Sequence, residues 1–428
     1  MTEAGLLERV ARVGNSDSPA EAFAEYRLAA PYLQDYKFVL ASPRGAAMGF
    51  AVNKDFPGGA AVRSLFGTER VVVLDPLTVS DMQSFNRAEY QIDYSISLDT
   101  QAVSHLEPYV SGRDPMKIDA DLQEVFEFIA RDDVSVDPLP YIVENLDNLK
   151  SGSASDRIFG KLKAYEVLRT LDLGRLKETG EAHSYLSPVE LTKRAQEFIG
   201  GMLYDRENAA MMAGLRFAHQ FSYVHLLKMV AIRLRWPKAS LQQNMERFAE
   251  FGDTVLATLG GRETALARAY FERGQDMDFF RKVQKNKPDL LEILRNMAWD
   301  LSHVRRMELA MTTQPTSSAR YFFSALLTFD KGLIEVLDLY PLKALAFKVG
   351  SAEPMPFFAG DWFDLVSDRA EGKVAFQNRY YSRDARASRN LRRLAVRESI
   401  DEIVASLENE VASVAEILPR GQYADLLY

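Results

Sequence analysis

The stretch SISLDTQAV, residues 95–103, predicts a strand followed directly by a helix, and the rest of the chain is interpreted from this element. A short strand-like run ends at Leu98, Asp99 and Thr100 follow at once, and the apolar residues beyond them recur at helical spacing. An Asp at the carboxyl end of a strand, directly before a helix, lies where open α/β sheets place their chemistry. The simpler interpretation is a strand-to-helix turn that Asp99 caps, and this stretch alone does not choose between the two.

The composition bounds the class of protein. The 428 residues are 47% hydrophobic and 26% charged, which is typical of a soluble globular chain of two or three domains. We find no apolar run of transmembrane length and no signal-peptide pattern, so we expect a cytoplasmic protein without membrane insertion. The absence of cysteine excludes disulfides and thiolate metal sites, and it fits a reducing compartment. A net charge of −8 argues against bulk electrostatic binding of nucleic acid but allows a local basic path.

The five histidines do not have the spacing of zinc ligands. His219 and His225 fall in an apolar and aromatic helix, where a packed core histidine is the favoured interpretation. Asp75 follows another strong strand, but Pro76 and the residues beyond it are typical of a helix entry, so we interpret Asp75 as structural.

Three further acidic residues accompany Asp99. The apolar run Tyr321–Thr328 predicts a buried strand, and Asp330 comes two residues after its end. Glu144 lies in the predicted helix 141–149. Asp300 lies among apolar residues of the predicted helix 290–311, where a buried carboxylate needs a partner or a metal ion. A pair with the following arginines of the same helix is the competing explanation for Asp300.

These stretches together resemble the motifs of PIN-domain nucleases. LDTQ, residues 98–101, resembles the Asp-Thr-Asn that closes the first PIN strand, and LTFDKGL, residues 327–333, is similar to the stretch that holds the last PIN acid. A helical Glu and a helical Asp come between them in that family, and they match Glu144 and Asp300. Two departures stand out: Gln101 replaces the usual Asn, and about 150 residues separate Glu144 from Asp300.

The resemblance implies an α/β fold, a PIN-like sheet flanked by helices, with a large all-helical insertion. The predicted segments are 1–92, an N-terminal α/β extension; 93–150, the first part of the PIN-like core; 151–289, the helical insertion; 290–340, the second part of the core; and 341–428, a C-terminal helical region.

Four carboxylates brought together repel one another, and divalent cations relieve that repulsion. Oxygen-only ligands suit Mg²⁺ or Mn²⁺, which can activate water for phosphodiester cleavage. The predicted catalytic and metal-binding residues are Asp99, Glu144, Asp300 and Asp330, with Thr100 and Thr328 in support. Glu335 and Asp338 offer two alternatives, extra ligands or, the favoured interpretation, solvated charges on a helix face.

The most basic stretch predicts where nucleic acid binds. On a helix that starts near Ser388, three arginines follow at intervals of four residues and share one face, and two tyrosines precede them. Arginine side chains pair with phosphates and tyrosines stack on bases. The predicted nucleic-acid-binding residues are Arg389, Arg393, Arg397, Tyr380 and Tyr381. A solvated helix face that pairs with the acids downstream is an equal alternative.

The sequence therefore predicts a metal-dependent nuclease, and the PIN resemblance alone favours an endoribonuclease over a deoxyribonuclease. The alternative from another class is a catalytically inactive PIN-like or helical scaffold that binds nucleic acid or a protein partner. A phosphatase-like α/β hydrolase is a third option, but the Asp turns lack the Asp-x-Asp spacing of the common aspartyl-phosphate enzymes. A homo-oligomer and a protein partner both stay open.

Overall fold

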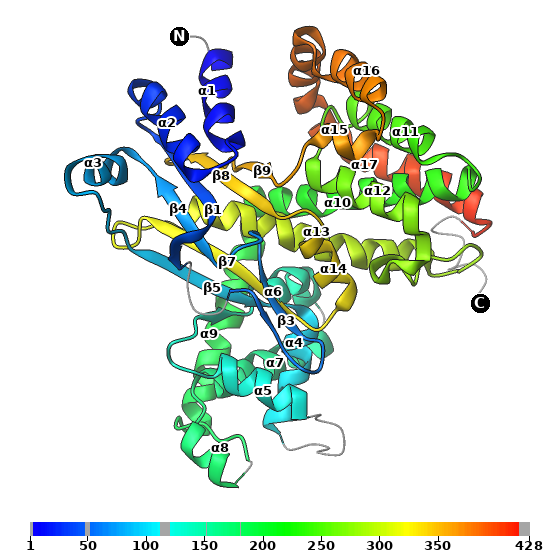
Figure 1. The fold of residues 1–428 in the computed structure, drawn as a ribbon. Helices are drawn as coiled ribbons and strands as arrows, with labels where there is room; N and C mark the ends of the chain where they lie inside the picture. The colour runs from blue at the N-terminus through cyan, green and yellow to red at the C-terminus, as the bar shows by residue number, and fades with distance from the viewer. Residues whose placement is uncertain (1–2, 48–51, 112–119, 151, 180, 419–428) are drawn as a thin grey trace. The chain divides into compact units, whose positions relative to one another are not determined.

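The structure is a computed structural model that describes residues 3–47, 52–111, 120–150, 152–179 and 181–418 (Figure 1). The chain forms two compact units, and each is described by itself. The first unit comprises Met1–Met212, Val304–Leu337 and Pro341–Phe357, and the second comprises Ala213–His303, Asp338–Tyr340 and Phe358–Tyr428.

Two sheets form the centre of the first unit. One has the order β4-β1-β8-β9, and its strands are β1 (Tyr36–Ala47), β4 (Arg70–Leu74), β8 (Leu342–Lys348) and β9 (Met355–Phe358). β1 pairs antiparallel with both β4 and β8. Gly45 passes so close to β4 that a Cβ atom there would lie 2.0 Å from the carbonyl oxygen of Val71, so this position of β1 requires glycine.

The second sheet has the order β2-β3-β7-β5-β6. Its strands are β2 (Lys54–Asp55), β3 (Ala61–Ser64), β5 (Ile92–Leu98), β6 (Val136–Asp137) and β7 (Tyr321–Thr328). β5 pairs parallel with β7 on one side and with β6 on the other. The predicted strand 321–328 and the predicted strand-to-helix turn at Asp99 are both confirmed. The two sheets are linked where the Leu342 N–H donates to the Leu65 carbonyl at 2.8 Å.

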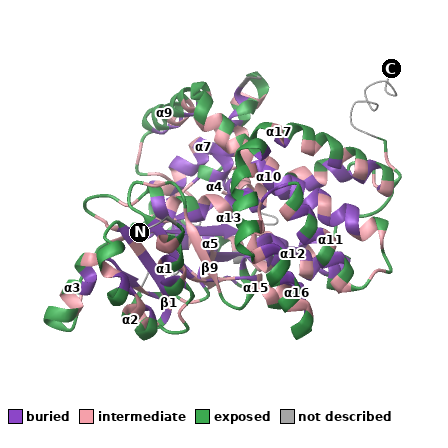
Figure 2. Ribbon diagram, turned by 90° about the horizontal axis from the view of Figure 1, so that it is seen from above, coloured by how far each residue is buried: buried purple, intermediate pink, exposed green. Residues whose placement is uncertain are grey.

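Helices cover these sheets because their apolar faces need burial. The helices that lie wholly in this unit are α1 (Glu3–Asn15), α2 (Pro19–Ala29), α3 (Pro76–Phe85), α4 (Thr100–Val110), α5 (Ala120–Ile129), α6 (Leu139–Asn145), α7 (Gly152–Arg169), α8 (Leu173–Thr179) and α9 (Pro188–Glu207). α1 and α2 pack on the first sheet around the buried Tyr26 and Phe38. α4 packs on β5, β7 and α7, and α7 packs on α9, whose outer face is exposed (Figure 2). The mixed α/β class is therefore confirmed.

Among the described residues of the second unit, the regular secondary structure is helical apart from Phe358 at the end of β9. Its helices are α11 (Leu241–Thr254), α12 (Gly261–Arg273), α15 (Trp362–Val366), α16 (Ala370–Tyr381) and α17 (Arg383–Ala415), and three others, α10 (Ala209–Arg235), α13 (Leu290–Thr313) and α14 (Lys331–Leu339), cross between the units. His219 and His225 are buried in this unit, as predicted for core histidines, and His219 packs 4.3 Å from Trp299 between ring centroids. In the described ranges, no helix has both the length and the apolar character needed to cross a bilayer.

Candidate functional site

Two parallel strands bring Asp99 and Asp330 to one edge of the second sheet. β5 and β7 run in register from Ile92 to Leu98, so their carboxyl ends meet at the same edge. The Asp99 N–H extends this pairing by donating to the Leu327 carbonyl at 3.1 Å. The loop after β7 then places Asp330 beside Asp99, where its negative charge acts on the Asp99 carboxyl.

Asp99 is a buried carboxylate held by two donors. It is the N-cap of α4, where one oxygen accepts the Ala102 N–H at 2.5 Å, and the Thr328 hydroxyl donates to the other oxygen. The same hydroxyl accepts the Asp330 N–H at 3.0 Å. Asp99 is 7% exposed and Thr328 is fully buried. Thr328 therefore connects both strand-end acids.

Glu144 reaches the same place from α6. The Thr100 hydroxyl, one residue beyond Asp99, donates to the Glu144 carboxylate at 2.7 Å. Burial raises the pKa of Asp99 to about 7, and the negative charges of Glu144 and Asp330 act in the same direction, whereas the hydrogen bonds from Thr328 and Ala102 lower it. Asp99, Glu144 and Asp330 thus form one electrostatic cluster within the first unit, here called the acid cluster.

Asp330 also closes the start of α14. Its Oδ1 accepts the Gly332 N–H at 2.7 Å and the Leu333 N–H at 3.2 Å, so it satisfies two of the free donors of that helix. The simpler interpretation of Asp99, a cap at a strand-to-helix turn, is therefore correct. Both residues cap a helix and also belong to the acid cluster.

Asp300 lies in α13, in the part of that helix that belongs to the second unit. The first unit by itself therefore contains three of the four predicted acids. Glu335 lies on α14 in the first unit and is half-buried, whereas Asp338 is exposed and belongs to the second. Asp75, interpreted as structural, is buried as the N-cap of α3 and accepts the Tyr321 hydroxyl at 2.7 Å.

Sequence reasoning missed a third strand-end acid, Asp137. β6 runs parallel to β5 and ends at Asp137, whose carboxylate accepts hydrogen bonds from the hydroxyls of Ser95 and Ser97. Arg306 lies near enough for Asp137 to raise its pKa, although burial lowers that pKa more strongly. The sequence held only a weak signal, an Asp directly after the short β-like run that ends at Val136, as Asp99 directly follows Leu98.

Lys161 on α7 is a second missed residue. Its ammonium donates to the Ser104 hydroxyl at 2.7 Å, and Ser104 in turn donates to the Thr100 carbonyl one helical turn earlier. Burial lowers the pKa of Lys161, against the opposing charge of Glu107. The Lys161 ammonium is therefore held one helical turn from Thr100, whose hydroxyl contacts Glu144 of the acid cluster.

The acid cluster offers hard oxygen donors of the kind that Mg²⁺ and Mn²⁺ prefer. In the part of the chain that the structure describes, however, no three His, Cys, Asp or Glu side chains form a group that could hold a metal ion. The donor chemistry of the acid cluster fits such an ion.

The predicted nucleic-acid-binding residues all lie in the second unit. α17 begins at Arg383, not near Ser388, because the Ser382 hydroxyl caps it by accepting the Ala385 N–H at 3.3 Å. Arg389 and Tyr380 are buried, and Arg389 pairs with Asp253 at 2.7 Å.

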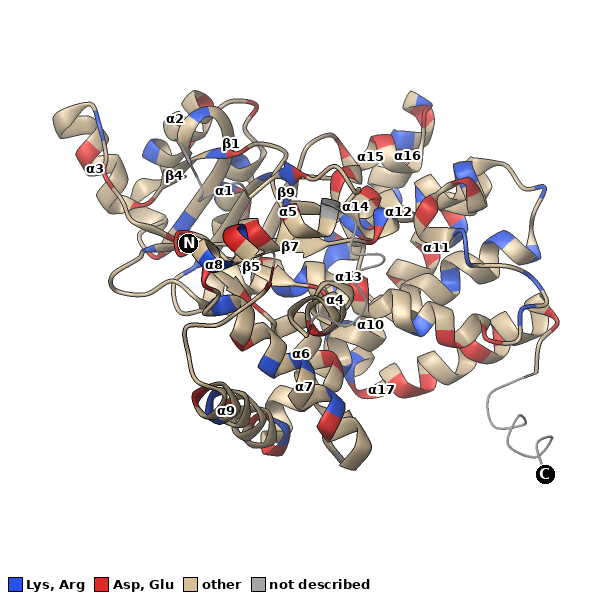
Figure 3. Cartoon of the chain, turned by 90° about the horizontal axis from the view of Figure 1, so that it is seen from below, with Lys and Arg blue, Asp and Glu red and all other residues tan. Residues whose placement is uncertain are grey.

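The remaining members of that set are more accessible. Tyr381 is half-buried against Trp362, at 5.2 Å between ring centroids. Arg393 donates to the Ala257 carbonyl at 3.5 Å, and Arg397 lies over the Phe217 ring. Basic and acidic residues are interspersed on the helices (Figure 3). Of the five predicted residues, Arg393 and Arg397 are the two that are exposed.

Comparison of the chain with family models, with curated proteins and with solved structures gives no match.

Proposed function

We propose that the chain is a PIN-like, Mg²⁺- or Mn²⁺-dependent nuclease, an endoribonuclease that hydrolyses phosphodiester bonds at the acid cluster. The observation that carries the proposal is the meeting of Asp99 and Asp330 at the ends of two parallel strands, with Glu144 joined to them through Thr100. The preference for RNA rests on the PIN resemblance alone.

In this proposal, the acidic residues bind the cation and the two threonines orient them. Asp99, Glu144 and Asp330 would hold the cation within the first unit. The resemblance implies Asp300 as a further ligand, and that residue lies in the second unit. A bound divalent ion lowers the pKa of a water molecule and stabilises the leaving oxygen of the phosphate. Thr328 holds the Asp99 carboxylate in one orientation, and Thr100 does the same for Glu144.

Positive charge for the substrate phosphates comes from near the same sheet edge. Lys161 on α7 contacts Ser104, which lies one turn along α4 from Thr100, and Arg306 lies beside Asp137 at the end of β6. Arginine and lysine attract phosphate, and partial burial keeps this attraction from being fully screened by salt.

An inactive scaffold is the second candidate, and one observation favours it. The carboxylates, as placed among the described residues, do not form a three-donor metal group. The two candidates differ in chemistry and agree in fold, so a cleavage assay separates them.

The test is cleavage of a mixed panel of RNA and single-stranded DNA with Mn²⁺, with EDTA, and with Asp99→Asn. We expect cutting of RNA with Mn²⁺, none with EDTA, and a loss of at least a hundredfold in Asp99→Asn. Asp93→Asn, an exposed carboxylate on the same strand, is the matched control and should cut like the unmodified chain. A folded protein that cuts nothing in any lane would favour the scaffold, and cutting unaffected by EDTA would remove the metal from the proposal.

A further inference from the structure

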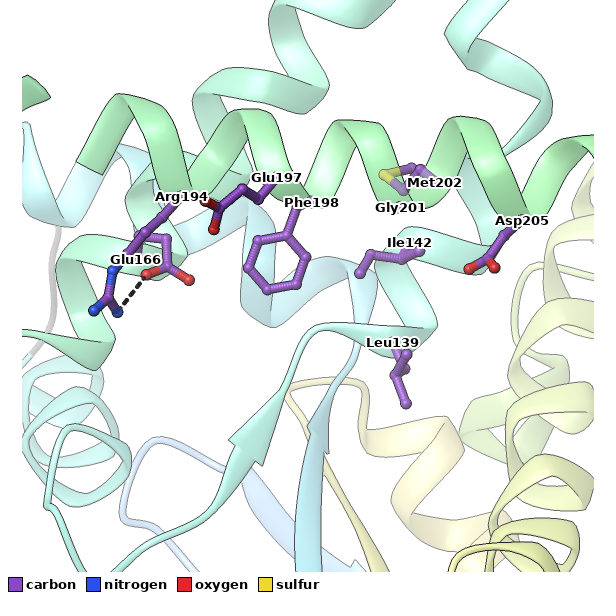
Figure 4. A pocket seen from close by; sticks show the side chains of 9 residues that line it. All are labelled: Leu139, Ile142, Glu166, Arg194, Glu197, Phe198, Gly201, Met202 and Asp205. Atoms are coloured by element: carbon purple, nitrogen blue, oxygen red, sulfur yellow. Dashed lines mark hydrogen bonds and ion pairs between the residues drawn. The ribbon is translucent and has the colours of Figure 1, made fainter. Parts of the chain in front are cut away.

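A pocket of about 590 Å³ lies among α6, α7 and α9 of the first unit (Figure 4). Its apolar lining comes from Leu139 and Ile142 on α6 and from Phe198 and Met202 on α9. Small-molecule sites have volumes of roughly 300–1,000 Å³ and mostly apolar walls with a few placed polar groups. The size and lining of this pocket match that description.

The charged residues of the pocket leave a net negative charge. Glu166 is buried and is neutralised by Arg194, whose Nη1 lies 3.3 Å from the Glu166 Oε2. Glu197 and Asp205 also line the pocket, and among the described residues neither carboxylate has an ion-pair or hydrogen-bond partner. A ligand that enters is therefore met by two uncompensated carboxylates and by apolar side chains.

The two carboxylates are separated along one side of α9. Glu197, Gly201 and Asp205 follow one another at intervals of four residues, so they share a face of the helix. A rise of about 1.5 Å per residue puts about 12 Å between the first and last Cα atoms. Figure 4 shows Phe198 and Ile142 between the ends of this row. The arrangement is an apolar trough with an anion toward each end.

Gly201 keeps the middle of the trough open. A Cβ atom built there meets nothing within 4 Å, and the same holds for Gly200, which does not line the pocket. Glycine weakens a helix interior, and here its missing side chain leaves room beside Phe198 and Met202.

We propose that this pocket binds a linear aliphatic polyamine, with ammonium groups at Glu197 and Asp205 and the methylene chain against Phe198 and Ile142. Two separated anions select a ligand with two separated cations, and the apolar floor selects an aliphatic chain between them. The carboxylates of Glu197 and Asp205 repel a phosphate group at either end of the pocket. The proposal does not depend on the nuclease activity.

The test is calorimetric titration of spermidine into the full chain, freed of nucleic acid. We expect saturable 1:1 binding, retained in Gly200→Leu and weakened at least tenfold in Gly201→Leu. The two substitutions are matched, because each removes a helical glycine and each side chain starts in open space. Both raise helix propensity, so both variants should fold, and circular dichroism checks this.

Charge variants complete the test. Glu197→Gln and Asp205→Asn should each weaken spermidine binding about tenfold, whereas Glu207→Gln, on the same helix outside the pocket, should not. Butylamine, with a single charge, should bind at least tenfold more weakly than spermidine. No saturable binding, equal binding by Gly200→Leu and Gly201→Leu, or equal binding of butylamine would each overturn the proposal.

Discussion

Opposing interactions act on the pKa of the buried Asp99 carboxyl. Two donors, Thr328 and the Ala102 N–H, stabilise its charged form, but burial outweighs them and raises its pKa to about 7. The chain therefore keeps at the end of β5 a group that is poorly stabilised in the absence of a cation. A buried carboxylate whose pKa is raised in this way is common at functional sites.

This placement predicts a dependence of stability on pH. Because the folded pKa of about 7 exceeds the model-peptide value of 3.8, the folded state retains a proton that the unfolded state has lost. The contribution of Asp99 to the free energy of unfolding is therefore greatest below pH 4, and it is lost as the pH rises through 7. Asp99→Asn should raise the free energy of unfolding at pH 8 by up to about 4 kcal/mol, and by much less at pH 4. Urea denaturation at both pH values measures this.

The control for that prediction is Asp93→Asn, whose carboxylate is exposed on the same strand. It should change the free energy of unfolding by less than about 0.5 kcal/mol at either pH. An Asp99→Asn variant that is less stable than the parent chain at pH 8 would show that the charged carboxylate is stabilising, and our account of its burial would be wrong.

At the scale of elements, the sequence predicts best where a pattern is long and continuous. β7 is an almost continuous apolar run of eight residues, and β5 is a seven-residue strand that Asp99 follows directly, and both were predictable. β6 is two residues long, too short for a period to show, so Asp137 was missed. Lys161 and Arg306 come from helices far along the chain, and only packing brings them near the sheet edge.

Helix α17 shows a property that the sequence pattern does not predict, the burial of its residues. The spacing of Arg389, Arg393 and Arg397 predicts a shared face, but it does not say how far that face is buried. Packing places the first of them at 6% exposure beside Asp253, and the other two in solvent. The spacing of residues determines which of them share a face of a helix. Whether that face is buried depends on which other elements pack against it.

This burial predicts a structural role for Arg389. Arg389→Ala should lower the free energy of unfolding by about 3 kcal/mol, because it leaves the Asp253 charge with only the longer 3.9 Å contact to Arg392. Arg397→Ala, which removes an exposed guanidinium, should cost less than about 1 kcal/mol. Guanidinium denaturation of the two variants makes the comparison, and equal small losses would contradict the role assigned to Arg389.

At the scale of the whole molecule, a net charge of −8 limits how nucleic acid can bind. General electrostatic attraction is absent, so affinity has to come from a few placed cations. Each phosphate contact on a single strand contributes about 0.7 to the slope of log K against log salt. A protein that uses two to four cations should therefore give a slope of about −1.5 to −3.

Fluorescence anisotropy with a labelled single-stranded RNA between 50 and 200 mM salt measures this slope. Lys161→Gln should reduce its magnitude by about 0.7, whereas Lys163→Gln, whose ammonium contacts Thr192 on α9, should not. A slope steeper than about −5 would point to a broad basic surface, and an unchanged slope in Lys161→Gln would remove that residue from the interface.

The short helix α6 contributes residues both to the pocket and to the acid cluster. Within seven residues, it presents Leu139 and Ile142 to the pocket and Glu144 to Thr100. So short a helix shifts as one piece, so a ligand that displaces one end also displaces the other. Thermodynamic linkage then makes the effect mutual: whatever factor a pocket ligand applies to cation affinity at the acid cluster, the cation applies to that ligand in return.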